Sequence, residues 1–299
     1  MADELGLLHL PQLSSSLLVR SQSHSSLIAR GRKDAASIMV RKSALTSPEA
    51  VTVLADQSDA IEQFNLGKMH YYGEGVQQDY TQAAVCFLKA AEQGLPIAQY
   101  CLGFLHAKGQ GVPQDFAQAA VWYRKAAEQG DARAQLNLGK MYSHGDGVAE
   151  DNALAAVWIR KAAEQGLATA QCNLGYRYQY GEGVPYDHQQ ATYWYRKAAE
   201  QGHVEAQASL GWRWLYNKDR GVPWLCGKGQ DAPLDYIEAY FWLKVSPPAE
   251  WLKRYYDAAA TAAAAVLTPT QLSEVEERAA KWLAQHPAST DATLAVAAN

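Results

Sequence analysis

The stretch that decides the fold is AAVWYRKAAEQG at residues 119–130, which returns almost unchanged as ATYWYRKAAEQG at residues 191–202. Looser copies end at Gly94 and Gly166, so the last glycine recurs every 36 residues. A Leu-Gly pair and a Gly-x-Gly-Val phrase keep the same step along the chain. Three phrases that share one period indicate an array of equal structural units rather than a single globular core.

The composition limits the classes of partner. The 299-residue chain carries a formal net charge of −4, whereas a surface that binds nucleic acid needs an excess of basic residues. No apolar run approaches the roughly 20 residues that a membrane-spanning helix requires. We therefore expect neither a nucleic-acid partner nor a membrane span.

The cysteines do not form a recurring pair. They occupy different positions of the repeat, and the chain contains no C-x-x-C motif. This pattern favours free thiols in a reducing compartment over disulfides or a zinc site. The four residues are Cys86, Cys101, Cys172 and Cys226.

One unit, residues 95–130, illustrates how each repeat is expected to fold. Apolar residues at helical spacing predict a first helix from about Ile97 to Lys108 with one buried face. Gly103 lies inside this helix, where it costs about 1 kcal/mol relative to Ala. Because a glycine recurs at this position, we expect a neighbouring helix to approach too closely for a Cβ atom.

The second helix of the unit has a start signal and a stop signal. Asp115 is the expected N-cap, and Gln118 three residues later completes a capping-box pattern. Gly130 is expected to end the helix. Between the two helices, the glycines of Gly-Gln-Gly-Val at residues 109–112 supply the positive φ angles of a helix end and a turn.

The flanking segments suggest a domain organisation around the repeats. Residues 1–46 carry no repeat phrase and are expected to be a disordered leader; a targeting segment and a translation start at Met39 are open alternatives. We predict a capping helix at residues 47–58, five repeats at 59–246, capping helices at 247–287 and a disordered tail at 288–299.

The fifth repeat departs from the period. Asp235, the expected N-cap of its second helix, comes 12 residues later than the period predicts. This indicates an insertion within about residues 217–234. Both a functional loop and a tolerated surface insertion fit such a segment.

Three phrases of the unit resemble the Sel1-like repeat: AQxxLG at residues 98–103, GxGVPxD at 109–115 and the stretch at 119–130. The resemblance covers about residues 59–246, and the segment LTPTQL at 267–272 is similar to the closing segment of bacterial Sel1-repeat proteins. It implies an all-α, right-handed superhelical solenoid of αα-hairpins, similar to tetratricopeptide repeats. It also implies an adaptor role in protein complexes, signalling or host interaction.

Some secreted, cysteine-rich members of this family have been described as penicillin-binding or β-lactamase-like. The recurring cysteine pairs of that subgroup are absent here. We find no catalytic constellation in the sequence and predict no enzymatic activity, no cofactor and no metal site. His70 and His106 share one position of the repeat, which holds Tyr142 and Tyr178 in later units, so ring packing is favoured over a metal pair.

Superposing the repeats by the Leu-Gly phrase predicts a binding surface on the first helices. The surface is an aromatic strip with a basic centre, a combination that anchors a peptide segment, often one with acidic groups. An open alternative is that several of these residues pack against neighbouring first helices. The predicted partner-binding residues are Phe64, Lys68, Tyr71, Tyr72, Tyr100, Phe104, Lys108, Arg133, Lys140, His144, Tyr176, Tyr180, Trp212 and Tyr216.

These observations predict a non-enzymatic scaffold that binds a segment of a partner protein in the groove formed by the first helices. The alternative is an exported β-lactamase-like or cell-wall-glycan-binding protein. We expect a cytoplasmic location for the scaffold, and a periplasmic or exported one for the alternative.

Overall fold

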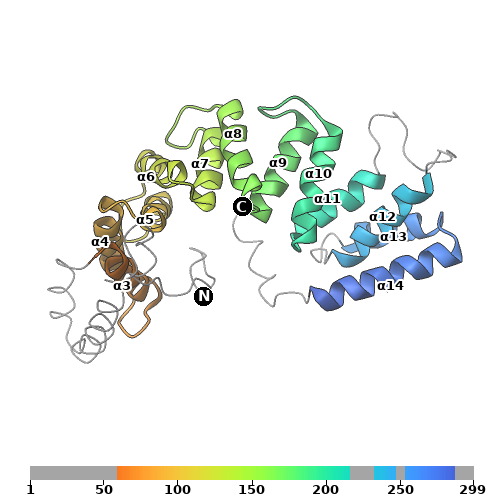
Figure 1. Ribbon diagram of the computed structural model, residues 1–299, viewed down its shortest axis with the longest axis horizontal. Coiled ribbons are helices and arrows are strands. Elements are labelled where there is room, and N and C mark those ends of the chain that lie inside the picture. Colours follow the sequence, from red (N-terminus) through yellow and green to blue (C-terminus); the bar gives the residue numbers. More distant parts are fainter. Residues whose placement is uncertain (1–58, 216–231, 247–252, 287–299) are drawn as a thin grey trace, which may run out of the picture. The chain divides into compact units, whose positions relative to one another are not determined.

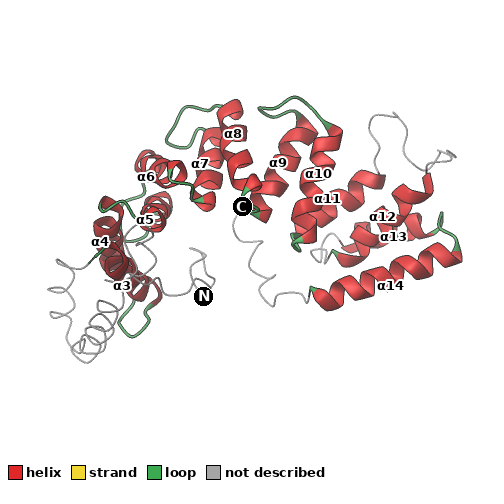
Figure 2. Ribbon diagram, in the orientation of Figure 1, coloured by secondary structure: helices red, strands yellow, loops and turns green. Residues whose placement is uncertain are grey.

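A computed structural model describes residues 59–215, 232–246 and 253–286 (Figure 1). These residues form helices joined by turns and contain no strand, which confirms the all-α fold (Figure 2). The helices succeed one another as antiparallel hairpins of a repeat solenoid. The predicted leader, the capping helix at 47–58, residues 217–231 of the predicted insertion and the tail lie outside the described residues.

The chain divides into two compact units between Glu150 and Asp151. In the first unit each helix packs against the next. Its helices are α3 (Ala60–Tyr72), α4 (Tyr80–Glu92), α5 (Pro96–Lys108), α6 (Phe116–Glu128) and α7 (Ala132–His144).

The second unit continues the same order and adds two terminal helices. α8 to α12 pack successively, and both α13 and α14 pack against α12. The helices are α8 (Asn152–Glu164), α9 (Ala168–Tyr180), α10 (His188–Glu200), α11 (Val204–Leu215), α12 (Ala232–Val245), α13 (Lys253–Ala264) and α14 (Pro269–Gln285). No helix of the described ranges is both long enough and apolar enough to cross a bilayer.

Aspartate caps begin the second helices, as the sequence predicts. The Asp115 side chain accepts a hydrogen bond of 2.9 Å from the backbone N–H of Gln118. The reciprocal bond expected from the Gln118 side chain is not formed, so the capping box is half made. A complete box occurs at the start of α14, where Thr268 and Gln271 bond each other's backbone N–H groups.

The mid-helix glycines mark the closest approach of the two helices of a hairpin. A Cβ atom on Gly103 would lie 2.8 Å from the Tyr123 ring of the paired helix, so this prediction is confirmed. In the fifth hairpin a Cβ on Gly211 would lie 2.8 Å from Leu243. The expected N-cap role of Asp235 is wrong, because α12 begins at Ala232 and includes Asp235 within its first turn.

The second glycine of three turns, Gly111, Gly147 and Gly183, has a role that the sequence did not reveal. Gly147 has a φ of 66° and faces the start of α6 in the preceding hairpin. A Cβ there would overlap the backbone of Phe116 and Ala117. The turn of one hairpin thus lies directly against the start of the preceding second helix, where only glycine fits.

Buried glutamines link consecutive hairpins. The Gln99 side chain of α5 donates a 3.1 Å hydrogen bond to the carbonyl oxygen of Ala91, at the end of α4. Its own amide oxygen accepts a 2.7 Å bond from Gln129 at the end of α6. In the second unit, Gln171 and Gln201 repeat this arrangement. The Ala-Gln and Glu-Gln-Gly phrases of the repeat therefore belong to one hydrogen-bond network.

Three cysteines of the described residues, Cys86, Cys101 and Cys172, are free thiols. Burial raises the pKa of Cys86 to about 11 and that of Cys172 to about 12, because the interior disfavours the thiolate. Both values exceed the ordinary 9.0.

The raised pKa values lead to a prediction about thiol reactivity. In a Cys226→Ser background at pH 8, Cys86 and Cys172 should react with a disulfide reagent at least about 100-fold more slowly in the native protein than in denaturant. The thiolate is the reacting species, and each unit of raised pKa lowers its fraction tenfold. Stopped-flow thiol titration with and without urea measures the ratio, and native reaction at the denatured rate would contradict the prediction.

Candidate functional site

Each compact unit has its own candidate surface, formed by two positions of its first helices, two and six residues after the leucine of the Leu-Gly phrase. We call it the first-helix face. In the first unit it comprises Lys68, Tyr72, Phe104, Lys108, Lys140 and His144. In the second unit Tyr176 and Tyr180 occupy these positions of α9.

The predicted aromatic residues of the first unit are largely buried. Phe64, Tyr71, Tyr100 and Phe104 are between 2% and 7% exposed. The Tyr100 ring lies 5.8 Å from the Tyr123 ring of α6, and the Tyr71 hydroxyl bonds Gln110 in the next turn. The Tyr100 ring thus packs on a second helix, whereas the alternative expected packing against neighbouring first helices.

The basic residues of the first unit lie on the outside of this aromatic layer. The Arg133 guanidinium of α7 lies 4.5 Å from the centroid of the Tyr100 ring and pairs with Asp131 at 3.1 Å. Farther along α5, the Lys108 ammonium lies 5.9 Å from the Phe104 centroid. Lys108 and Lys140 are exposed, so the ammonium groups of these two predicted residues lie at the surface of the first unit.

The other members of the first-helix face in this unit have mixed surroundings. His144 is exposed and its Nδ1 bonds the Lys140 carbonyl oxygen at 2.8 Å. Lys68 is half-buried, and so is Tyr72, whose ring meets the Tyr71 ring edge-on with centroids 4.9 Å apart.

In the second unit the aromatic residues of the face are open to solvent. Tyr176 is 46% exposed and Tyr180 is 56% exposed, although Tyr176 occupies the same position of the repeat as the buried Phe104. Their ring centroids lie 4.5 Å apart. Partial desolvation, followed by the charge of Glu182, raises the pKa of Tyr176. Two adjacent exposed rings form a ready contact surface for a partner.

The last two predicted residues are only partly within the structure. Trp212 belongs to α11, but its side chain lies outside the described residues. Tyr216 lies outside them altogether.

The second helices carry a different exposed stripe, which the site prediction did not include. Val85, Val121, Val157 and Tyr193 occupy one position of the repeat and are each more than 40% exposed. Beside this stripe, the Lys125 ammonium lies 4.0 Å from the centroid of the Trp122 ring, and Lys161 lies 4.1 Å from that of Trp158. The 36-residue recurrence was the signal that could have identified this stripe.

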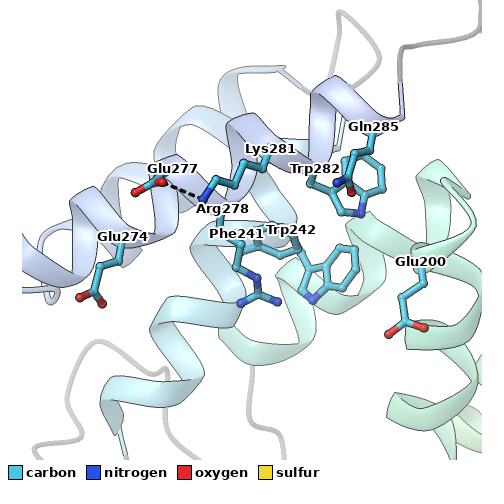
Figure 3. Close-up of a pocket in the computed structure, with 9 residues that line it drawn as sticks. All are labelled: Glu200, Phe241, Trp242, Glu274, Glu277, Arg278, Lys281, Trp282 and Gln285. Carbon is cyan, nitrogen blue, oxygen red and sulfur yellow. Dashed lines mark ion pairs between the residues drawn. The ribbon is translucent and has the colours of Figure 1, made fainter.

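A cleft of about 500 Å³ lies at the C-terminal end of the second unit, between α10, α12 and α14 (Figure 3). Its lining residues are Glu200, Phe241, Trp242, Glu274, Glu277, Arg278, Lys281, Trp282 and Gln285. Lys281 pairs with Glu277 at 2.7 Å, as the dashed line in Figure 3 shows. Arg278 pairs with Glu238 at 2.6 Å and lies 3.9 Å from the centroid of the Phe241 ring.

The cations of this cleft are therefore occupied by contacts within the protein. The Trp242 indole also donates a 3.2 Å hydrogen bond to Glu238. The Arg278 contacts with Glu238 and Phe241 hold α14 against α12, so we assign the cleft to the terminal packing rather than to the primary site. Throughout the described residues, no group of three or more His, Cys, Asp or Glu side chains could hold a metal ion.

The Sel1 repeat matches this chain at residues 63–95, 96–131, 132–167, 168–203 and 204–245. The fold is similar to that of c5321, a protective antigen present in uropathogenic Escherichia coli strains and displaying an SLR fold, with 33% sequence identity and a TM-score of 0.57. The similarity covers 82% of this chain and 53% of that one, so this chain spans about half the length of that protein.

A second similar structure is a Sel1 repeat protein from Oxalobacter formigenes, with 31% identity and a TM-score of 0.56. It covers 73% of this chain and 85% of that one. No curated protein sequence matches the chain. The matched repeats extend over more than half of the sequence and coincide with the helical hairpins of the structure. The chain therefore belongs to the Sel1 repeat family.

Proposed function

We propose that this protein is a non-enzymatic scaffold that binds a segment of a partner protein on its first-helix face. Sel1 repeats typically mediate protein–protein interactions, which supports a protein partner. The observation that carries the proposal is the exposed pair Tyr176 and Tyr180 on α9. Exposed tyrosines supply contact area at a low cost in conformational entropy and are frequent anchors of protein interfaces.

A cytoplasmic location is part of the same proposal. The free thiols at Cys86, Cys101 and Cys172 support it, because disulfides are rare in reducing compartments.

The test is a Tyr176→Ala/Tyr180→Ala double variant. A partner would first be identified by affinity capture from the source cell and then purified, and calorimetry would measure its binding to each variant. We expect the double variant to weaken binding at least about tenfold, because the loss of an aromatic anchor from an interface commonly costs more than 1 kcal/mol. Little change in stability is expected, since both side chains are exposed.

The matched control is Tyr193→Ala. Tyr193 is 48% exposed on α10, close to the exposure of Tyr176, but it belongs to the stripe of the second helices. Its replacement should change the affinity by less than about twofold. Full binding by a folded Tyr176→Ala/Tyr180→Ala variant, or an equal loss with Tyr193→Ala, would refute the role of the first-helix face.

A further inference from the structure

We infer that the first-helix face of the first unit binds an acidic segment and that Lys108 and Lys140 together receive its carboxylates, an inference that rests on the proposed function. The lysines belong to the first-helix face of the first unit, on the neighbouring first helices α5 and α7. The inference concerns the chemistry of the partner, which neither the family nor its fold determines.

The geometry of the two helices brings the lysines together. α5 and α7 are both first helices and run in the same direction, and Arg133 of α7 lies against Tyr100 of α5. Lys108 follows Tyr100 by eight residues, and Lys140 follows Arg133 by seven. At 1.5 Å rise per residue, each lysine lies about two turns beyond this contact, toward the same end of the two helices. Partial desolvation, followed by the charge of Lys108, lowers the pKa of Lys140.

The charges on this part of the surface are not balanced within the protein. Arg133 is neutralised by Asp131, whereas neither Lys108 nor Lys140 forms an ion pair with any described residue. Two neighbouring ammonium groups repel each other. Their positive charge is local, because the whole chain has a net charge of −4. A carboxylate between the lysines would remove the repulsion and form two charge-assisted hydrogen bonds.

The arrangement suits a protein carboxylate better than a nucleic acid. Nucleic-acid binding depends on many cations that follow successive phosphates, whereas this pair supplies two point charges beside an aromatic layer. The Lys108 ammonium lies 5.9 Å from the centroid of the Phe104 ring. A short acidic segment matches the charge of this exposed pair of lysines.

The experiment uses the full-length protein and a fluorescein-labelled synthetic peptide of four Glu-Glu-Phe triplets. The matching Gln-Gln-Phe peptide is the uncharged probe, and an oligothymidylate of equal length is the nucleic-acid probe. Fluorescence anisotropy measures the affinity of each. We expect the Glu peptide to bind about tenfold more tightly than the Gln peptide, and Lys108→Glu/Lys140→Glu to abolish this preference.

The matched control is Lys125→Glu/Lys161→Glu, which changes the net charge by the same amount. Both lysines are exposed on second helices, so this variant should keep the preference for the Glu peptide within about twofold of the unchanged protein. Circular dichroism establishes that each variant is folded. Lys108→Gln/Lys140→Gln, which removes charge without adding any, should lose most of the preference as well.

Several outcomes would overturn the inference. These are equal binding of the Glu and Gln peptides, no binding of the Glu peptide up to about 1 mM, or an equal loss in the Lys125→Glu/Lys161→Glu control. Oligothymidylate that binds as tightly as the Glu peptide through the same lysines would assign the pair to phosphates instead. If both peptides bind alike and Tyr176→Ala/Tyr180→Ala weakens both, the proposed function stands while the acidic partner is excluded.

Discussion

Replacing Gly147 by Ala is expected to lower the free energy of unfolding by about 3 kcal/mol or more. The φ of 66° alone costs an L-residue roughly 1–2 kcal/mol. The added Cβ would also overlap the backbone of Phe116 and Ala117, and a helix start cannot move aside as a flexible side chain can. Urea denaturation followed by circular dichroism measures the loss as a lower midpoint at an unchanged slope.

Gly130→Ala is the matched control for this prediction. Gly130 also has a positive φ, of 95°, but a Cβ there would meet nothing within 4 Å. It should therefore cost only the conformational strain, roughly 1–2 kcal/mol. Equal losses for the two variants would show that the contact between the turn and the preceding helix contributes nothing.

The second large effect is expected for Gln99→Leu, with a loss of about 1–3 kcal/mol. Gln99 is 4% exposed and donates to the Ala91 carbonyl, which the variant would leave with only backbone donors, such as Gly94. The bond from Gln129 is lost as well, and each hydrogen bond contributes about 0.5–1.5 kcal/mol. Thermal and urea unfolding of the variant measure the loss.

The coupling between Gln99 and Gln129 gives a sharper measurement. Because the two side chains share a hydrogen bond, Gln99→Leu/Gln129→Leu should cost less than the sum of the single variants. Gln118→Leu, an exposed glutamine without a side-chain bond, is the control and should change stability by less than about 0.5 kcal/mol. A Gln99→Leu variant as stable as Gln118→Leu would contradict the importance of the network.

The parts of the fold that depend on local chemistry could be predicted from sequence. Gly103 was identified as a point of close approach because a mid-helix glycine has a local cost that only a close neighbour explains. Asp115 was identified as a cap because its bond closes within three residues. The role of Gln99 could not be read in the same way, because its acceptor belongs to the preceding hairpin and the pairing depends on how hairpins stack.

From the sequence, the candidate site could be predicted only as the helix face on which its side chains lie, not as the exposure of those side chains. Phe104 and Tyr176 occupy the same position of the repeat, yet they are 7% and 46% exposed. The position fixes the side on which a side chain leaves its helix, whereas the neighbouring side chains decide how much of it is covered. Phe104 lies beneath Lys108, which extends over its ring. The C-terminal cleft was missed because it depends on how α14 packs on α12, which no repeat phrase encodes.

The close approach of Gly211 and Leu243 has a consequence for how such a chain can diversify. Leu243 lies 32 residues after Gly211, whereas Tyr195 lies 20 after Gly175, yet both pairs make the same glycine contact. Extending the connection from the seven residues 181–187 to the sixteen residues 216–231 costs about 0.7 kcal/mol in closure entropy. The close glycine contact between paired helices is therefore compatible with connections of different length.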